Sequence, residues 1–140
     1  MKILLAVDGS EYTQRMLDYV AAHKDDLGAT NSFTVFNAVL AVPPHAASFV
    51  SRATLHVYYE QEARQVIDPI RDFFKDKGIE AEYRHQAGQP AEQICSVAQE
   101  GGVDLLMMGS HGHGALSNLV LGSVATQVLA RCSVPVLLVR

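Results

Sequence analysis

Apolar residues gather in short runs along the chain, and each run predicts a β-strand. Runs at residues 3–7, 33–39, 103–108 and 134–139 are apolar, and the first is continuous, as expected for a central strand that helices cover on both faces. Residues 79–85 instead alternate apolar and charged side chains, which is typical of a strand with one wet face near a sheet edge. The pattern therefore predicts five strands.

Apolar residues three and four positions apart lie between these runs and predict helices. The first helix covers residues 11–26 and is expected to stop at Gly28. A longer helix contains Pro69, and because an interior proline costs about 3 kcal/mol, we expect either a kink there or two separate helices. The buried stripe of this longer helix is predicted to comprise Tyr59, Ala63, Val66, Ile70 and Phe73.

Prolines and glycines mark the remaining boundaries. Pro43 and Pro44 end the second strand, and residues 43–53 are predicted to form a mobile loop. Pro90 suits the first turn of a helix that Gly101 terminates. The inward-facing stripe of the last helix is expected to consist of Val124, Ala125, Val128, Leu129 and Cys132.

Strands and helices thus alternate along one domain of residues 1–140. Alternation of this kind implies right-handed crossovers and a doubly wound, five-stranded parallel sheet in a three-layer α/β/α arrangement. Ligands of such folds bind beyond the carboxyl ends of the strands, where the winding reverses. We expect the first and fourth strands to flank that crevice.

Composition removes several classes of function. The chain has 140 residues, of which 49% are hydrophobic, so it is long enough to bury a core without disulfides or metals. Its net charge is −4 and no basic run is present, which argues against a nucleic-acid partner. No apolar run is long enough for a signal-peptide core or a membrane span, so we expect a cytoplasmic protein without membrane contact. Cys95 and Cys132 lack CxxC spacing and are interpreted as small core hydrophobes without chemistry.

A glycine-rich segment follows the fourth strand. Gly109 and Gly112 come first, and Gly122 with Ser123 opens the last helix. Glycine lets the backbone pass close to an anion, and the first turn of a helix offers unpaired N–H groups, so such loops bind phosphate. The spacing fits neither a P-loop nor a dinucleotide-binding loop.

The spacing G-x2-G-x9-G-[S/T] resembles the nucleotide-binding signature of the universal stress protein family. The resemblance extends from Asp8-Gly9-Ser10, through the Gly88-Gln89-Pro90-Ala91 helix entry, to the final strand. It implies a Rossmann-like or flavodoxin-like fold of the adenine nucleotide alpha hydrolase type. It also implies binding of ATP or a related adenine nucleotide, with Mg²⁺, in a stress-response sensor or regulator. The family comparison further implies a homodimer through the C-terminal strand, at Val134, Val136 and Leu138.

Site roles follow from the same resemblance, position by position. Gly109 and Gly112 look like the turn that lets backbone approach ribose and phosphates, while Asp8 faces the nucleotide near the ribose or base. Ala38 and Val39 lie where the family places its adenine-contacting backbone and apolar wall. The expected nucleotide-binding residues are Asp8, Gly9, Ser10, Ala38, Val39, Met108, Gly109, His111, Gly112, His113, Gly122, Ser123, Val124 and Ala125, with no catalytic residue and no metal ligand.

The chain departs from the family pattern in the nine-residue spacer. Many members place an Arg or Lys there, whereas residues 113–121 contain His113 and no permanent cation. Phosphate charge would then be met by backbone dipoles, a divalent metal or imidazolium. Binding is therefore expected to depend on Mg²⁺ and on pH.

Simpler interpretations stand beside these. The glycines could merely turn a strand into a loop and permit helix packing, and Asp8 could form an Asx-turn or cap the first helix, with Ser10 the better candidate for the cap. His111 and His113 lack a third metal ligand nearby and are by default surface-loop histidines. A hydrolytic set could be drawn from Asp8, Ser10, Ser110 and His111, but no GxSxG elbow supports it.

Three functions remain, of which the first is preferred and the adenylating enzyme is the least favoured. The first is a nucleotide-binding regulator without efficient turnover, because no Lys, Arg or convincing base accompanies the loop. The second is a carboxylate-adenylating enzyme, whose Ser-Gly-Gly-x-Asp-Ser loop is missing at residues 7–11. The third is a nucleotide-free dimerisation and interaction module, ranked below the first because the glycine pattern is intact.

Overall fold

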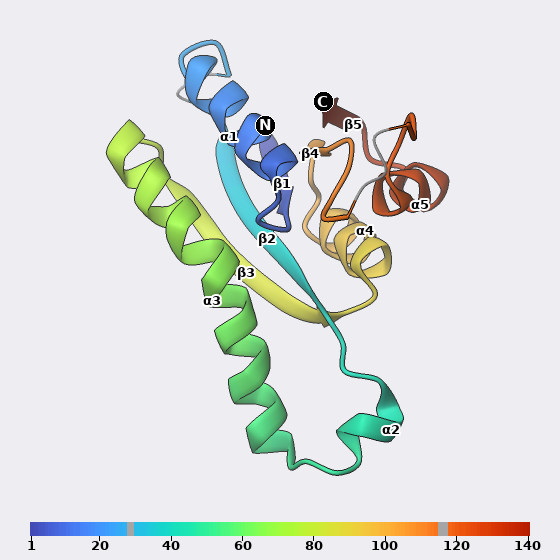
Figure 1. Cartoon of the computed structure of the whole chain (residues 1–140). Coiled ribbons are helices and arrows are strands. Elements are labelled where there is room, and N and C mark those ends of the chain that lie inside the picture. The colour runs from blue at the N-terminus through green and yellow to red at the C-terminus, as the bar shows by residue number, and fades with distance from the viewer. Residues whose placement is uncertain (28–29, 115–117) are drawn as a thin grey trace.

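Five parallel strands form one sheet in the order β3-β2-β1-β4-β5 (Figure 1). The structure is a computed structural model that describes residues 1–27, 30–114 and 118–140. β1 lies at the centre, hydrogen-bonded to β2 and β4, and β3 lies at one edge, as predicted. The strands are β1 (Lys2–Val7), β2 (Ser32–Leu40), β3 (Ala81–Gly88), β4 (Leu105–Gly109) and β5 (Val136–Val139).

Helices cover both faces of the sheet, so the predicted three-layer fold is confirmed. α1 and α3 pack on one face, where Leu5 and Phe74 belong to one buried cluster. α4 and α5 pack on the other face, over a second cluster that includes Leu106 and Val128. The helices are α1 (Glu11–Ala22), α2 (Pro44–Ala47), α3 (Arg52–Lys77), α4 (Pro90–Glu100) and α5 (Ser123–Arg131).

The first helix ends earlier than its sequence pattern predicts. α1 stops at Ala22. The ring of His23, the next residue, stacks on the ring of Tyr19, and its Nδ1–H donates a hydrogen bond to the Tyr19 carbonyl oxygen at 2.8 Å. The same carbonyl accepts the last helical hydrogen bond of α1, from the His23 N–H at 3.1 Å. The predicted stop at Gly28 lies outside the described residues.

The segment after β2 is not a loop throughout, contrary to the prediction for residues 43–53. It contains α2, with Pro44 in its first turn, and the start of α3. Ser51 caps α3, since its Oγ accepts a hydrogen bond from the Thr54 N–H at 3.1 Å. The arm formed by α2 and the start of α3 extends beyond the end of β2 (Figure 1).

α3 is one continuous helix through Pro69, so the alternative of two helices is wrong, and the kink stays a prediction. Its most buried residues are Ala63, Ile67, Ile70 and Phe74, so the stripe is displaced by one position from Val66 and Phe73. The expectation for α5 is wrong at Leu129, which is 46% exposed, and Cys132 follows the last helical residue as its C-cap.

No helix among the described residues is both long and apolar enough to cross a bilayer. The cytoplasmic location and the dimer stay predictions.

Candidate functional site

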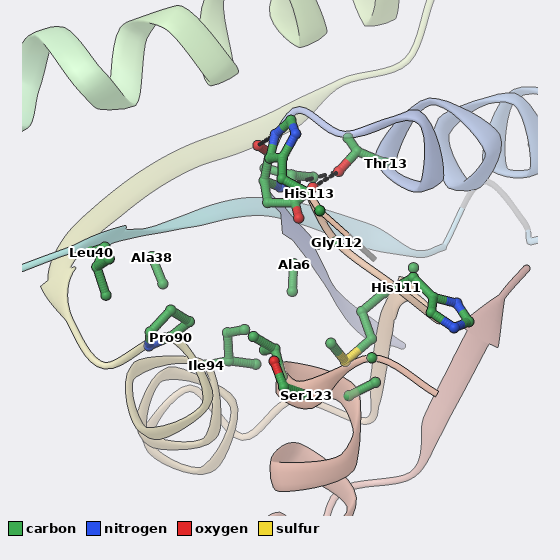
Figure 2. Close-up of a pocket in the computed structure, with 18 of the residues that line it drawn as sticks. Ala6, Thr13, Ala38, Leu40, Pro90, Ile94, His111, Gly112, His113 and Ser123 are labelled. Atoms are coloured by element: carbon green, nitrogen blue, oxygen red, sulfur yellow. Dashed lines mark hydrogen bonds between the residues drawn. The ribbon is translucent and has the colours of Figure 1, made fainter. Parts of the chain in front are cut away.

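A cavity of about 560 Å³ opens at the carboxyl ends of β1 and β4, which are adjacent in the sheet (Figure 2). The first turns of α4 and α5 form one side of it. Segments that are more than one hundred residues apart in the sequence thus meet at the position where a doubly wound sheet places its ligand. The described residues that line it are Ala6, Val7, Asp8, Thr13, Ala38, Leu40, Pro90, Ile94, Met108, Gly109, His111, Gly112, His113, Gly114, Leu119, Gly122, Ser123, Val124 and Ala125.

Three glycines of this loop are required by space. A Cβ on Gly109 would lie 2.6 Å from Cβ of Tyr12, and one on Gly122 would lie 3.0 Å from Cα of His111. A Cβ on Gly112 would lie 2.6 Å from Oδ2 of Asp8. None of the three has a positive φ, so close approach rather than backbone conformation disfavours a side chain there, and at Gly112 the obstacle is the tip of a side chain.

The start of α5 presents free amides to the cavity. Gly122 is the N-cap residue and supplies no side-chain hydrogen bond to the helix. Its own N–H donates to the Ser110 carbonyl oxygen at 2.8 Å, which fixes the helix start against the end of β4. The N–H groups of Ser123, Val124 and Ala125 come before the first intrahelical donor, the N–H of Thr126, which donates to the Gly122 carbonyl oxygen. They have no partner within the helix and carry the positive end of its dipole, so this position suits an anion.

Asp8 is held by the start of α1. Its Oδ1 accepts hydrogen bonds from the Ser10 N–H and the Thr13 hydroxyl, both at 2.9 Å. Ser10 in turn caps the helix by accepting from the Thr13 N–H at 3.4 Å, as predicted. The Asx-turn interpretation of Asp8 is therefore confirmed, and its second oxygen stays directed at Gly112 on the cavity wall.

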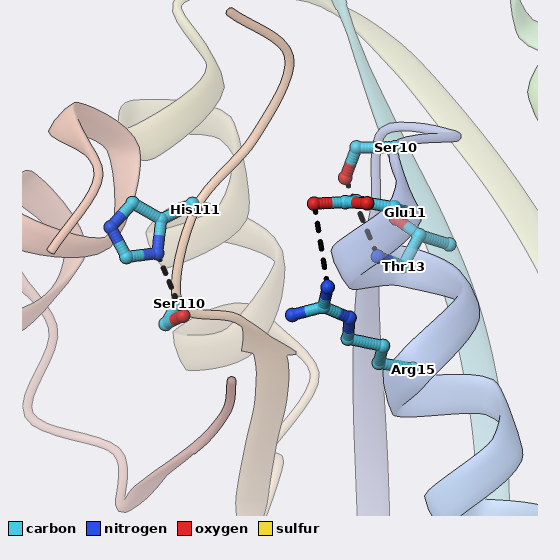
Figure 3. Close-up of polar contacts among 6 residues, drawn as sticks. All are labelled: Ser10, Glu11, Thr13, Arg15, Ser110 and His111. Atoms are coloured by element: carbon cyan, nitrogen blue, oxygen red, sulfur yellow. Dashed lines mark hydrogen bonds and ion pairs between the residues drawn. The ribbon is translucent and has the colours of Figure 1, made fainter. Parts of the chain in front are cut away.

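The two loop histidines each bind a backbone carbonyl. Nε2 of His113 donates to the Asp8 oxygen and Nε2 of His111 to the Leu119 oxygen, both at 2.8 Å, since a carbonyl only accepts. In its neutral form His111 then accepts at Nδ1 from the Ser110 hydroxyl, 2.9 Å away (Figure 3). The ring of Tyr12 lies 5.0 Å from that of His111. His111 therefore ties both ends of the glycine loop together.

This arrangement weakens two of the simpler interpretations. Ser110 is only 1% exposed and does not line the cavity, so its hydroxyl is poorly placed as a nucleophile. The Asp8 carboxylate bonds to Ser10 and Thr13 rather than to His111. Among the residues that the structure describes, no group of three His, Cys, Asp or Glu side chains could hold a metal ion.

Among the described residues that line the cavity, one side chain, that of Asp8, carries a permanent charge. Asp8 is the single carboxylate in the described lining, and neither Lys nor Arg belongs to it. The positive potential therefore comes from the α5 amides and, when protonated, from His111 and His113. The floor is apolar.

A sequence model described as the universal stress protein family matches residues 1–140. The chain belongs to the universal stress protein family. It is 30% identical to the universal stress protein YxiE of Bacillus subtilis, over 99% of this chain and 98% of that protein. It is also similar to the solved structure of MJ0577, from Methanocaldococcus jannaschii, with 30% identity, a TM-score of 0.81, and 99% and 94% of the two chains covered.

Other universal stress proteins of the same fold have been solved with nucleotides. One is in complex with cAMP, with 21% identity, a TM-score of 0.72, and 100% and 97% of the chains covered. One from Arabidopsis thaliana has AMP bound, with 14% identity, a TM-score of 0.68, and 99% and 90% covered. One from Archaeoglobus fulgidus is in complex with dAMP, with 20% identity, a TM-score of 0.68, and 100% and 98% covered.

The structure brings most of the residues expected from the family signature to one cavity, and leaves three outside it. Gly9 and Ser10 lie on the far side of the β1–α1 turn, against α3, where Ser10 acts as the helix cap. The side chain of Val39 packs with Ala63 and Ile67 on the face beneath α3, so it is not part of an apolar cavity wall. The expected residues that line the cavity are Asp8, Ala38, Met108, Gly109, His111, Gly112, His113, Gly122, Ser123, Val124 and Ala125.

The family signature does not include several residues that line the cavity, although the two-residue period of a strand and the turn of a helix indicate some of them. Successive residues of a strand face opposite sides, so Ala38 in the cavity implies Leu40 beside it and excludes Val39. Likewise Ile94 lies one helical turn beyond Pro90 on the same face of α4. The remaining residues not anticipated are Ala6, Val7, Thr13, Gly114 and Leu119.

Replacing His111 with alanine is expected to lower the free energy of unfolding by about 1–3 kcal/mol, because it leaves the buried Ser110 hydroxyl without its hydrogen-bond partner. Urea denaturation measures the change. Removing both partners, in the double variant His111→Ala with Ser110→Ala, should recover part of the loss. Equal stability of the single and double variants would contradict this role for His111.

Proposed function

We propose that this universal stress protein binds ATP or a related adenine nucleotide in the cavity and acts as a stress-response sensor or regulator. One observation carries the proposal: the free amides of α5, the three close-packed glycines and an apolar floor meet in one cavity of about 560 Å³. A nucleotide has the same three parts, an anion, a sugar and a flat apolar base. The cAMP, AMP and dAMP complexes of other family members support this choice of ligand class.

The phosphates are assigned to the start of α5. The amides of Ser123, Val124 and Ala125 would donate to phosphate oxygens, and the Ser123 hydroxyl lines the same wall. Gly112 and Gly122 carry no side chain that would hold a phosphate away from this position. The anion would thus bind mainly through the backbone.

The base is assigned to the apolar end of the cavity. Ala38 and Leu40 come from the end of β2, and Pro90 and Ile94 from the facing end of α4 (Figure 2). Leu40 is largely exposed in the chain as described, so a bound base would remove part of its surface from water.

The ribose is assigned to Asp8. Its Oδ1 is occupied by Ser10 and Thr13, which fixes the carboxylate, and Oδ2 remains on the cavity side next to Gly112. A carboxylate oxygen accepts hydrogen bonds from ribose hydroxyls and repels phosphate. The sugar would then lie between the apolar end and the amides.

Mg²⁺ fits this site as a companion of the phosphates. Mg²⁺ prefers oxygen ligands and in nucleotide sites is held by one or two carboxylates together with phosphate oxygens. Asp8 is the one carboxylate in the described lining, so the chain would contribute little of the coordination itself. With no Lys or Arg in that lining to stabilise a transferring phosphoryl group, we propose that turnover is slow or absent.

ATP binding is expected to weaken when EDTA removes Mg²⁺. It is also expected to be about fivefold weaker, the equivalent of about 1 kcal/mol, at high pH than at low pH, because imidazolium attracts phosphate and neutral imidazole does not. Isothermal titration of the full chain measures both effects. The matched variant His113→Gln keeps an N–H donor but cannot carry a positive charge. The part of the pH dependence of ATP affinity that His113 contributes should therefore be absent in this variant. Affinity indifferent to EDTA and pH would overturn this account of phosphate neutralisation.

The ligand itself is identified by mass spectrometry of nucleotide retained on gently purified protein. An adenine nucleotide in stoichiometric amount supports the proposal. Absence of any retained nucleotide, together with no binding of ATP, ADP, AMP or cAMP at millimolar concentration, would instead favour the nucleotide-free interaction module. Stimulated pyrophosphate release with a panel of carboxylates would favour an adenylating enzyme.

We also propose a homodimer through the C-terminal strand. β5 pairs with β4 alone within the described chain, so its other edge is available to a second copy. The segment that includes Val134, Val136 and Leu138 is half-buried and carries no charge until Arg140. Light scattering would show a dimer, and a Val136→Pro variant, which interrupts strand pairing, should dissociate it.

A further inference from the structure

The two cysteines of the chain lie on the face of the sheet that α4 and α5 cover. Cys95 is in the middle of α4 and is 6% exposed. Cys132 is the C-cap residue of α5 and is half-buried, with its N–H donating to the Val128 oxygen at 2.8 Å. Both belong to one apolar cluster between the helices and the sheet, although they are far apart in the sequence.

The two thiols are close enough to influence each other's ionisation. Burial raises the pKa of the Cys95 thiol to about 11, and the neighbouring Cys132 contributes to the rise. α4 and α5 pack against each other, which holds the pair in place.

We propose that Cys95 and Cys132 form a reversible intramolecular disulfide when the protein meets a hydroperoxide. Cys132, at the end of its helix and partly open to solvent, is the thiol that the oxidant reaches first. Cys95, buried beside it, is the resolving thiol. A metal site is a poorer use of this pair, because structural zinc needs four ligands and only two thiols meet here.

The chemistry proceeds in two steps. The Cys132 thiolate attacks one oxygen of the hydroperoxide, the O–O bond breaks, and the alcohol, or water from hydrogen peroxide, leaves with the proton that Cys132 gave up. Cys132 is then a sulfenic acid. Cys95 loses its proton and attacks that sulfur, the S–O bond breaks, and water leaves as the S–S bond forms. Two thiols are thereby oxidised and one hydroperoxide is reduced.

The bond would join α4 and α5, and the N-terminal ends of both helices line the cavity. α4 begins at Pro90 and α5 follows Gly122, and both of these residues line the cavity. The closed loop from 95 to 132 would contain β4 and the whole glycine-rich segment. Closing a loop of this length restricts the unfolded chain, so the oxidised protein is expected to melt about 5–10 °C higher than the reduced protein.

The test treats the full-length reduced protein with hydrogen peroxide, blocks remaining thiols with N-ethylmaleimide and records the intact mass. We expect a monomer that has lost two hydrogen atoms and takes up no label, and that dithiothreitol returns to a doubly labelled form. Formation should accelerate as the pH rises toward the pKa of Cys95, about 11. Two labelled thiols after peroxide treatment, or disulfide-linked dimers in place of the monomer, would overturn the proposal.

Two serine variants separate the roles of the thiols. Cys95→Ser should accumulate a sulfenic acid at Cys132 that dimedone traps, because no neighbour resolves it. Cys132→Ser should react with peroxide at least tenfold more slowly, since Cys95 is buried and protonated. Circular dichroism of the reduced variants checks that both are folded, and equal reactivity of the two variants would contradict the assigned order.

Discussion

Replacing Gly122 with valine is expected to weaken nucleotide binding by about 100-fold or more, equivalent to about 2.7 kcal/mol. A Cβ at this position would lie 3.0 Å from Cα of His111 and 3.2 Å from the Ser110 carbonyl oxygen, so the branched side chain must push the helix start away from the end of β4. The Gly122 N–H would then lose its 2.8 Å hydrogen bond to that carbonyl. The amides that follow would no longer converge on the phosphates.

Isothermal titration with the nucleotide found on the purified protein measures this loss, and circular dichroism checks that the variant is folded. The matched control is Ser123→Ala, which removes a hydroxyl but leaves every amide in place, and should weaken binding by about tenfold or less. Light scattering should show that the oligomeric state is unchanged. A folded Gly122→Val protein with undiminished affinity would move the phosphate site away from α5.

Replacing Phe74 with alanine is expected to lower the free energy of unfolding by about 3–5 kcal/mol, because the vacated volume lies between α3 and the sheet and neighbouring side chains fill it incompletely. Phe74 is 0% exposed and belongs to the same cluster as Leu5 and Ile70. Urea denaturation, monitored by circular dichroism, reports the difference.

The chain offers its own control for this substitution. Phe49 follows α2 and is 76% exposed, so Phe49→Ala removes the same atoms without opening a cavity and should change the stability by less than about 0.5 kcal/mol. Similar losses for the two variants would mean that the α3 face is not the core of the domain. Neither substitution touches the cavity lining, so the affinity of the folded fraction for nucleotide should stay unchanged.

The layers and the strand arrangement could be predicted because they depend on side chains repeated along whole elements. Residues 3–7 are apolar on both faces, as expected for a strand that helices cover on both sides, and β1 is central. The alternation in residues 79–85 likewise placed β3 at an edge. The glycine spacing also reflects the fold itself, since a side chain at Gly109, Gly112 or Gly122 would meet the Cβ of Tyr12, the tip of Asp8 or the backbone near His111.

Features set by single contacts could not be predicted in the same way. At the end of α1 the ring of His23 stacks on Tyr19 and binds its carbonyl oxygen, a single contact that has no periodic signature. α2 is one turn long, too short for a helical pattern to emerge after Pro43. The role given to Val39 failed because the resemblance marked the end of the strand without its register, and a shift of one residue changes the face.

The close contacts of the signature glycines differ in kind, so a larger residue could be accommodated at position 112 but not at position 109. At Gly112 the obstacle is the Oδ2 atom of Asp8, so shortening that side chain, as in Asp8→Ala, would leave room for alanine at 112. At Gly109 the obstacle is the Cβ of Tyr12, an atom that every residue except glycine possesses. Alanine at position 112 should therefore be tolerated only together with a shorter residue at position 8, with loss of the proposed ribose contact, whereas position 109 should stay glycine while any side chain remains at 12.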